Sequence, residues 1–295
     1  MKNLTIFTPT YNRAYCLYQL YDSLFRQTNP DFVWMLIDDG STDNTKDLVE
    51  LWKTENKIEI IYIYQENQGM HGAHNTAYAN ITSLLNVCID SDDYMPDNAI
   101  EIILKHTENL DKTNFAGIVA LDATKDGKII GTSIPNHLEK VKLNELYLKH
   151  GVKGDKKLVL FTHLIKEIPP YPLFKGERFV PLDYKYLLMD QKFDLKPVNE
   201  VLCIVEYQPD GSTMNIFRQY RNNPKGFAFS RISRIDYGLT ITEKIKNSIH
   251  LVSSTLFSGD FSDLFKTKYT FLVLVSFPFG LLLNGYIRYK APITR

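Results

Sequence analysis

Short apolar runs alternate with helix-spaced apolar positions along the first 125 residues, and this pattern predicts alternating strands and helices. The apolar runs predict five strands, at residues 4–8, 33–37, 58–64, 84–89 and 115–121. The segments between them predict helices at 17–24, 42–52, 73–80 and from Pro96 onward. Ser41 or Thr42 is the predicted cap of the second helix. Because these units recur at intervals of roughly 25 to 30 residues, we predict right-handed crossovers and a mainly parallel α/β sheet flanked by helices.

The second half of the chain is less regular. It predicts strands at 129–133, 158–162 and 198–207, with a short helix at 184–189. Beyond Pro209 the pattern becomes basic and helical, and it leads into an apolar tail. We therefore expect an α/β domain over residues 1–207 and a helical C-terminal appendage over residues 208–295.

The tail has a composition that suits a membrane surface. Residues 269–287 contain no charge, Pro278 and Gly280 interrupt the run, and Arg288 and Lys290 follow. Three interpretations stay open: an in-plane or shallow re-entrant anchor, a buried core helix, or a full span. We favour the first, with peripheral contact through residues 269–290 at the inner face of the cell membrane, because basic residues suit anionic lipid.

Overall composition narrows the class of protein. Lysine plus arginine and aspartate plus glutamate each total 34, so the formal net charge is zero and no nucleic-acid partner is predicted. Cys16, Cys88 and Cys203 have no short spacing, which indicates reduced thiols in a cytoplasmic protein. The chain enters its first strand at once, so we expect no secretory signal.

An acid-rich segment follows the fourth predicted strand. Asp90, Asp92 and Asp93 stand within four residues, and carboxylates so close repel one another. A divalent metal relieves that repulsion, since Mg²⁺ and Mn²⁺ prefer oxygen ligands and bind substrate phosphates. The alternative is a solvated turn and helix cap.

Polar segments also follow the first three predicted strands, at residues 8–13, 38–41 and 65–69. In a parallel sheet these ends meet at one edge, where α/β folds bind ligands. Asp39 can accept a hydrogen bond from a base, and Pro9 or Tyr11 can pack on the base plane. Asp90 can reach ribose, while Asp92 holds a metal against a diphosphate. We expect acids from distant parts of the chain to gather around this one cation.

These segments resemble those of inverting glycosyltransferases of family 2, which have the nucleotide-diphospho-sugar-binding GT-A fold. The matching segments are residues 8–13, 37–43, 67–69, 73–75 and 90–93. The resemblance covers roughly residues 1–125, the nucleotide-sugar half, and more loosely 155–207 within the acceptor-side half, 126–207. It implies that Asp39 contacts uracil or a related base, that Asp90 lies near ribose, and that Asp92 coordinates Mg²⁺ or Mn²⁺. The other donor-binding candidates are Thr8, Pro9, Tyr11, Arg13, Asn67, Gly69, His74 and Ser91.

The segment from Gly69 to Asn75 allows two interpretations. Relatives often carry a basic residue here, where this chain has His71 and His74. Either histidine can approach the diphosphate or sugar; alternatively, the small residues simply let a helix pack closely on the sheet. Gly69 is expected to be mainly a turn residue.

An inverting transferase needs a general base for the acceptor hydroxyl, and family members usually supply it from a Glu-Asp pair. The matching positions are Leu182 and Asp183, so the chain lacks the common Glu. Asp183 is the predicted base and Glu177 the second candidate or an acceptor-binding group. The alternatives are a helix N-cap for Asp183 and an ion pair with Arg178 for Glu177.

Processive relatives carry a Gln-x-x-Arg-Trp run. The nearest segment here, Phe217 to Asn222, has no tryptophan, which favours addition of one sugar per acceptor. Arg218 and Arg221 can meet a diphosphate or lie on an exposed helix.

The sequence thus predicts a metal-dependent transferase that uses a nucleotide diphosphate sugar, UDP-sugar being favoured. The expected acceptor is a glycan or a polyprenyl-linked sugar of cell-surface polysaccharide synthesis. A nucleotidyltransferase stays open, although such enzymes normally begin with a Gly-rich phosphate loop and residues 8–13 contain no glycine. A non-catalytic nucleotide-sugar-binding protein of the same fold is the other alternative.

Overall fold

The computed structural model describes residues 2–206 and 216–292, which group into two compact units. The first, here called the sheet unit, comprises Met1–Gln68, Gly72–Pro169 and Lys192–Gln208. The second, the helical unit, comprises Gly69–His71, Pro170–Gln191 and Pro209–Arg295.

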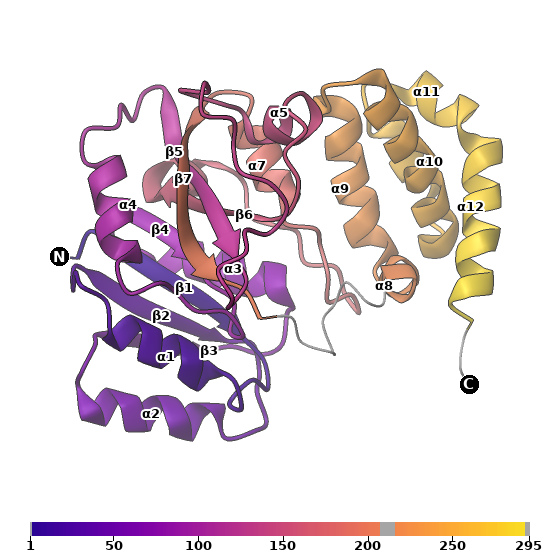
Figure 1. Ribbon diagram of the computed structural model, residues 1–295. Helices are drawn as coiled ribbons and strands as arrows, with labels where there is room; N and C mark the ends of the chain where they lie inside the picture. Colours follow the sequence, from indigo (N-terminus) through magenta and orange to yellow (C-terminus); the bar gives the residue numbers. More distant parts are fainter. Residues whose placement is uncertain (1, 207–215, 293–295) are drawn as a thin grey trace. The chain divides into compact units, whose positions relative to one another are not determined.

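The sheet unit is built on one mixed sheet (Figure 1). Its strands are β1 (Leu4–Thr10), β2 (Phe32–Asp38), β3 (Ile60–Tyr64), β4 (Leu85–Cys88), β5 (Phe115–Ala123), β6 (Lys156–Phe161) and β7 (Asp194–Ile204). They lie in the order β3-β2-β1-β4-β6-β5-β7. Strands β3, β2, β1 and β4 run parallel, β5 and β7 are parallel to each other, and β6 is antiparallel to both of its neighbours. The prediction of a mainly parallel α/β sheet is confirmed.

Six helices lie in this part of the chain, although the first two residues of α3 belong to the helical unit. They are α1 (Leu17–Phe25), α2 (Thr45–Glu55), α3 (Met70–Asn80), α4 (Ala99–Thr107), α5 (Leu143–Leu148) and α6 (Thr162–Glu167). Figure 1 shows α1 and α2 together on one side of β1, β2 and β3. There Tyr21 stacks on Trp52 with ring centroids 4.4 Å apart, and both rings lie near the fully buried Trp34. Strands β1 and β2 are buried along their whole length, as expected of parallel strands covered on both faces.

Two predicted helix starts were wrong. Helix α2 begins at Thr45, not at a Ser41 or Thr42 cap, because Asp43 accepts hydrogen bonds from the Thr45 amide and hydroxyl. Helix α4 begins at Ala99, since the Pro96 carbonyl accepts from the Ala99 amide and makes a turn first.

The predicted strand at 129–133 was also wrong, because this segment makes only one bridge, Ile129 to Ala123. Gly131 has φ 74°, and the Thr132 amide donates to the Lys153 carbonyl. A Cβ at Gly131 would lie 1.9 Å from that same carbonyl oxygen. The backbone thus turns toward another loop instead of extending along the sheet. The predicted last strand ends at Ile204, and its expected end at 207 lies outside the described residues.

The helical unit contains α7 (Asp183–Met189), α8 (Ile216–Asn222), α9 (Pro224–Tyr237), α10 (Ile241–Ser258), the 3₁₀ segment η2 (Phe261–Phe265), α11 (Thr270–Val275) and α12 (Phe277–Lys290). Helix α10 lies between α9 and α12 (Figure 1). The unit has its own apolar core, formed by Ala228, Ile235, Leu251, Val252, Leu264 and Val273. None of the helices within residues 2–206 and 216–292 is both long enough and apolar enough to cross a bilayer.

Candidate functional site

The loops after β1 and β2 are tied together at the carboxyl edge of the sheet. Asn12 has a left-handed backbone, with φ 53°. Its amide donates to the Ser41 hydroxyl at 2.8 Å, and its side-chain oxygen accepts from the Thr42 amide at 2.7 Å. The Asp39 amide donates to the Thr10 carbonyl at 2.8 Å. These bonds fix the two loops against each other.

Asp39 connects this pair of loops to the segment that follows β3. It is buried, and one carboxylate oxygen accepts from the Gln65 side chain at 2.6 Å and from the Gln68 amide at 2.8 Å. A Cβ on Gly40, which has φ 88°, would lie 3.0 Å from the Asn67 nitrogen. The close approach of Gly40 and Asn67 therefore requires glycine.

The neighbouring acid, Asp38, has a structural role. Its carboxylate accepts from the Ser41 amide at 2.8 Å and from the Tyr62 hydroxyl at 2.5 Å. Burial, together with this carboxylate, raises the pKa of Tyr62. Since β4 also pairs with β1, with the Ile89 amide donating to the Phe7 carbonyl at 3.1 Å, the four predicted strand ends share one edge.

The donor-binding candidates on the first loop differ in exposure. Thr8 is fully buried, and its hydroxyl accepts from the Trp34 indole at 3.0 Å. Pro9 is also buried within β1. Tyr11 is about half exposed, at 49%. Arg13 contacts the hydroxyl and ring of Tyr15. Of these four candidates, therefore, Tyr11 is the most exposed.

In the acid-rich segment after β4, one aspartate is buried and two are partly exposed. Asp93 is buried, and its carboxylate accepts from the Glu206 amide at 3.2 Å. Its own amide donates to the Asp90 carbonyl at 3.1 Å, which closes a turn. Asp90 and Asp92 are partly exposed, whereas Ser91 is buried. Asp90 and Asp92 are thus the acids with surface open to a ligand.

Lys157, on β6, is the charge that the sequence analysis missed. Its ammonium lies 4.0 Å from a carboxylate oxygen of Asp122, and both side chains are largely buried. Burial opposes the charge of Lys157, but Cys203 and the carboxylates of Asp122, Asp90 and Asp93 outweigh it and raise the pKa of the lysine well above its ordinary value. In the sequence, this buried charge could have been suspected from a lysine that stands at the start of the apolar run forming β6.

Replacing Lys157 with methionine is expected to destabilise the sheet unit by about 3 kcal/mol, because a buried carboxylate loses its counter-charge. Urea unfolding followed by circular dichroism measures this change. Adding Asp122→Asn should recover part of the loss, since it removes the unpaired charge. Lys46→Met, on the exposed side of α2, is the matched control. Equal stability of the Lys157 and Lys46 variants would contradict the role given to this ion pair.

The residues after β4 fit a divalent cation held together with a substrate phosphate. Burial, together with the carboxylates of Asp90 and Asp92, raises the pKa of Asp93 to about 7 against the opposing effects of Lys157 and the Glu206 amide. The carboxylates of Asp90 and Asp92 therefore disfavour a further negative charge at Asp93. Within residues 2–206 and 216–292, no three His, Cys, Asp or Glu side chains are placed to hold a metal alone. Acids from distant parts of the chain thus do not gather as expected; Mg²⁺-type sites, however, commonly combine one or two carboxylates with phosphates.

His74 lies in the core of the sheet unit. Its ring packs edge-on against Phe7, with centroids 5.0 Å apart at 88°. Its Nδ1 atom is 3.4 Å from the Tyr78 hydroxyl, and its Nε2 atom is 3.7 Å from Cys88 Sγ. These contacts favour the close-packing interpretation over contact with a ligand.

Gly69 and His71 belong to the helical unit. Gly69 has φ 82°, and a Cβ there would lie 1.9 Å from the Arg178 carbonyl oxygen. Only glycine fits this turn and close approach. His71 is buried, which lowers its pKa to about 4 and keeps the ring neutral near pH 7.

Glu177 caps a helix, a role that the sequence analysis did not include. Its two carboxylate oxygens accept from the Lys225 amide at 3.0 Å and the Gly226 amide at 2.8 Å, in the first turn of α9. Burial raises the pKa of Glu177, although the two amides act in the opposite direction. A carboxylate at a helix N-terminus satisfies otherwise unpaired amides.

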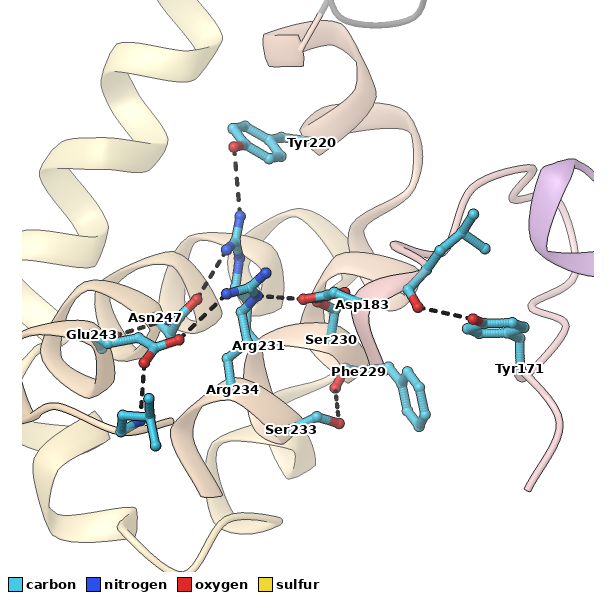
Figure 2. Close-up of polar contacts among 12 residues, drawn as sticks. Tyr171, Asp183, Tyr220, Phe229, Ser230, Arg231, Ser233, Arg234, Glu243 and Asn247 are labelled. Carbon is cyan, nitrogen blue, oxygen red and sulfur yellow. Dashed lines mark hydrogen bonds and ion pairs between the residues drawn. The ribbon is translucent and has the colours of Figure 1, made fainter. Parts of the chain in front are cut away.

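Asp183 is the first residue of α7 and is held by two donors from α9 (Figure 2). Its carboxylate accepts from the Ser230 hydroxyl at 3.1 Å and is ion-paired with Arg234 Nε. Arg234 Nη1 also lies 3.3 Å from Glu243. The N-cap position belongs to Leu182, so the N-cap alternative for Asp183 was wrong. The arginine and serine fix the orientation of the Asp183 carboxylate.

Next to this group, Arg231 donates to Asn247 at 2.9 Å and to the Tyr220 hydroxyl at 3.5 Å (Figure 2). Burial lowers its pKa. Of the arginines on α8, Arg218 is exposed, while Arg221 Nη1 donates to the Ala291 carbonyl at 2.5 Å.

A mainly parallel sheet with an acid after β2 and an acid-rich turn after β4, joined through an antiparallel strand to a second parallel pair, is the GT-A class of fold. The family model described as glycosyl transferase family 2 matches residues 5–166, more than half of the chain. The chain belongs to glycosyl transferase family 2.

Curated relatives match a smaller part of the chain. Glycosyltransferase GlyA of Streptococcus pneumoniae is 31% identical over 102 residues, which is 35% of this chain and 14% of that protein. The putative teichuronic acid biosynthesis glycosyltransferase TuaG of Bacillus subtilis is 28% identical over 131 residues, 43% of this chain and 52% of that protein. The matched region therefore spans about half or less of these relatives.

Solved structures share the fold over nearly the whole chain. S. aureus TarS 1-349 in complex with UDP-GlcNAc has a TM-score of 0.64 and 18% identity, covering 99% of this chain and 82% of that one. Mannosyltransferase PcManGT from Pyrobaculum calidifontis, in complex with GDP-Man and Mn²⁺, has a TM-score of 0.56 and 15% identity, covering 96% and 87%.

Proposed function

We propose that this protein transfers one sugar from a nucleoside diphosphate sugar, with UDP-sugar favoured, to a glycan or polyprenyl-linked acceptor, inverting the anomeric centre. The observation that carries the proposal is the placement of Asp39, Asp90 and Asp92 at one edge of a parallel sheet, within the region that the family 2 model matches. The UDP-GlcNAc complex of a protein with this fold supports a uridine donor. The TuaG relative supports a place in bacterial cell-surface polysaccharide synthesis.

The donor-side residues have distinct proposed roles. Asp39 accepts from the base, and its bonds to Gln65 and the Gln68 amide hold the carboxylate in place. Tyr11, half exposed, packs on the base plane. Asp90 reaches ribose, and Asp92 holds Mn²⁺ or Mg²⁺ against the diphosphate; the Mn²⁺ complex of PcManGT supports a divalent metal. When bound, such an ion acts as a Lewis acid for the leaving diphosphate.

The acceptor side supplies the general base. Asp183 accepts the proton of the acceptor hydroxyl while that oxygen attacks the anomeric carbon. The bond from this carbon to the diphosphate oxygen breaks, and the nucleoside diphosphate leaves. Attack from the opposite side converts an α-linked donor into a β-linked product. Asp183 is preferred to Glu177, because Glu177 is buried and caps the backbone of α9 with both oxygens, whereas the Asp183 side chain is 22% exposed.

A thermal-shift panel tests the donor assignment. UDP-sugars with Mn²⁺ are expected to raise the melting temperature more than GDP- or dTDP-sugars, since a ligand at 100 times its Kd stabilises by about 2.7 kcal/mol. Release of UDP from the stabilising donor then separates the alternatives. A nucleotidyltransferase would instead release pyrophosphate from a nucleoside triphosphate. A non-catalytic binding protein would be stabilised without any turnover.

A further inference from the structure

Helix α12 has an inner face that packs on α10. A Cβ on Gly280 would lie 2.4 Å from Val252 Cβ, so the two helix backbones approach closely. Asn284 donates to the Ser253 carbonyl at 3.1 Å, and Ile287 is buried. These three positions follow the spacing i, i+4, i+7 and form one stripe along the helix.

The outer face of α12 is apolar and exposed. Leu282 is 73% and Tyr289 80% exposed, and Tyr286 between them is about half exposed. Each of these three residues follows a residue of the inner stripe by two positions. Two positions correspond to about 200° of rotation around the helix axis. They therefore lie opposite the stripe that packs on α10. Phe271 of α11 and Phe279 of α12 are also exposed, so large apolar side chains continue along this part of the chain.

Positive charge accompanies this face. Helices α11 and α12 contain two charged residues, Arg288 and Lys290, and no aspartate or glutamate; before them, Lys266 is ion-paired with Asp263 at 2.7 Å. Lys290 Nζ lies 5.8 Å from the Tyr286 ring centroid and 6.0 Å from that of Tyr289. An ammonium group thus borders the exposed rings.

The exposed apolar face and the adjacent positive charge favour one binding partner over the alternatives. A second copy of the same face would bring the two Lys290 ammonium groups together, and α12 has no aspartate or glutamate to balance them. A helix of 14 residues is about 21 Å long, shorter than the hydrocarbon core of about 30 Å. Apolar and tyrosine side chains with adjacent bases suit the boundary between lipid headgroups and acyl chains.

We propose that α12 lies in the plane of an anionic phospholipid bilayer surface. Leu282, Tyr286 and Tyr289 enter the headgroup–acyl boundary, and Lys290, which borders these rings, meets the phosphates. The reason for such docking, access to a lipid-linked acceptor, rests on the proposed function; the docking itself does not.

Vesicle flotation of the full chain tests the proposal. The protein is expected to float with vesicles of 70% phosphatidylcholine and 30% phosphatidylglycerol, and less with phosphatidylcholine alone. Leu282→Glu should lower partitioning about tenfold or more, because one large apolar contact is lost. Lys290→Gln should lower it about fivefold on anionic vesicles only. Leu51→Glu, which changes a 56% exposed leucine on α2, is the matched control and should float like the parent protein.

Several outcomes would overturn the proposal. These are failure of the parent protein to float, an equal loss in the Leu51 variant, or a dimer that Leu282→Glu converts to monomer without any vesicle binding. Donor-induced thermal stabilisation is measured on the same samples and should persist in Leu282→Glu. If no sample shows donor-induced thermal stabilisation but flotation follows the expected pattern, the proposed function is wrong. The proposal that α12 binds a membrane surface is then still supported.

Discussion

Replacing Asp183 with asparagine is expected to lower turnover about a thousandfold while leaving donor binding nearly unchanged. A positioned general base contributes about 10² to 10⁴ in rate, and asparagine cannot take the proton. The Ser230 hydroxyl and the Arg234 guanidinium, which hold the carboxylate, remain to bind the amide oxygen. Release of UDP from the donor that the thermal-shift panel identifies measures turnover, and the melting-temperature shift measures donor binding.

Two controls make the Asp183 result specific. Ser230→Ala removes one hydrogen bond but keeps the carboxylate and its arginine, so its loss of turnover should stay below about tenfold. Glu177→Gln keeps the shape of the cap on α9 and should change stability more than rate. If Glu177→Gln abolishes turnover and Asp183→Asn does not, the assignment of the base is wrong.

Asp92→Asn is expected to have an effect of similar size on the donor side. In the proposed function Asp92 is a ligand of the metal, so its loss should weaken metal binding. A metal that acts as a Lewis acid contributes several kcal/mol of charge stabilisation, or about a thousandfold in rate. Turnover measured across a Mn²⁺ titration should fall and should need far more metal. As a readout independent of turnover, the extra thermal stabilisation that Mn²⁺ adds to UDP should disappear.

Asp97→Asn is the matched control for Asp92. Asp97 lies in the same connection between β4 and α4, is exposed, and pairs with Arg26 at 3.1 Å. Its variant should retain both turnover and the Mn²⁺ effect. If the Asp92→Asn variant keeps its full metal-stimulated turnover, the metal has no place in the proposed function.

The strands of the sheet could be predicted from the sequence, because each strand and its end are marked by residues that lie close together in the chain. A run such as 33–37 is apolar at every position, and it is followed at once by acids and a glycine, so both the strand and its end are marked. The meeting of the first four strand ends then follows from parallel pairing alone. The direction of β6 has no such signal, since a buried strand reads the same in either direction.

The finer features of the candidate site depend on distant partners. Neither the inward turn of Asp93 nor the burial of Lys157 is visible in a local window, because each depends on strands that are remote in sequence. The capping role of Glu177 has the same cause, since its partner amide at Lys225 is 48 residues away. Short acidic motifs thus identified a candidate ligand edge but did not separate open carboxylates from buried ones.

The conformation of Asn12 restricts which residues its position can accept. Glycine would tolerate the left-handed backbone but would remove the oxygen that binds the Thr42 amide. Larger or branched side chains would be strained by the positive φ and would not supply that hydrogen-bond acceptor. Aspartate alone offers a similar oxygen at the same reach, so sequence variation at this site should be confined almost wholly to these two residue types.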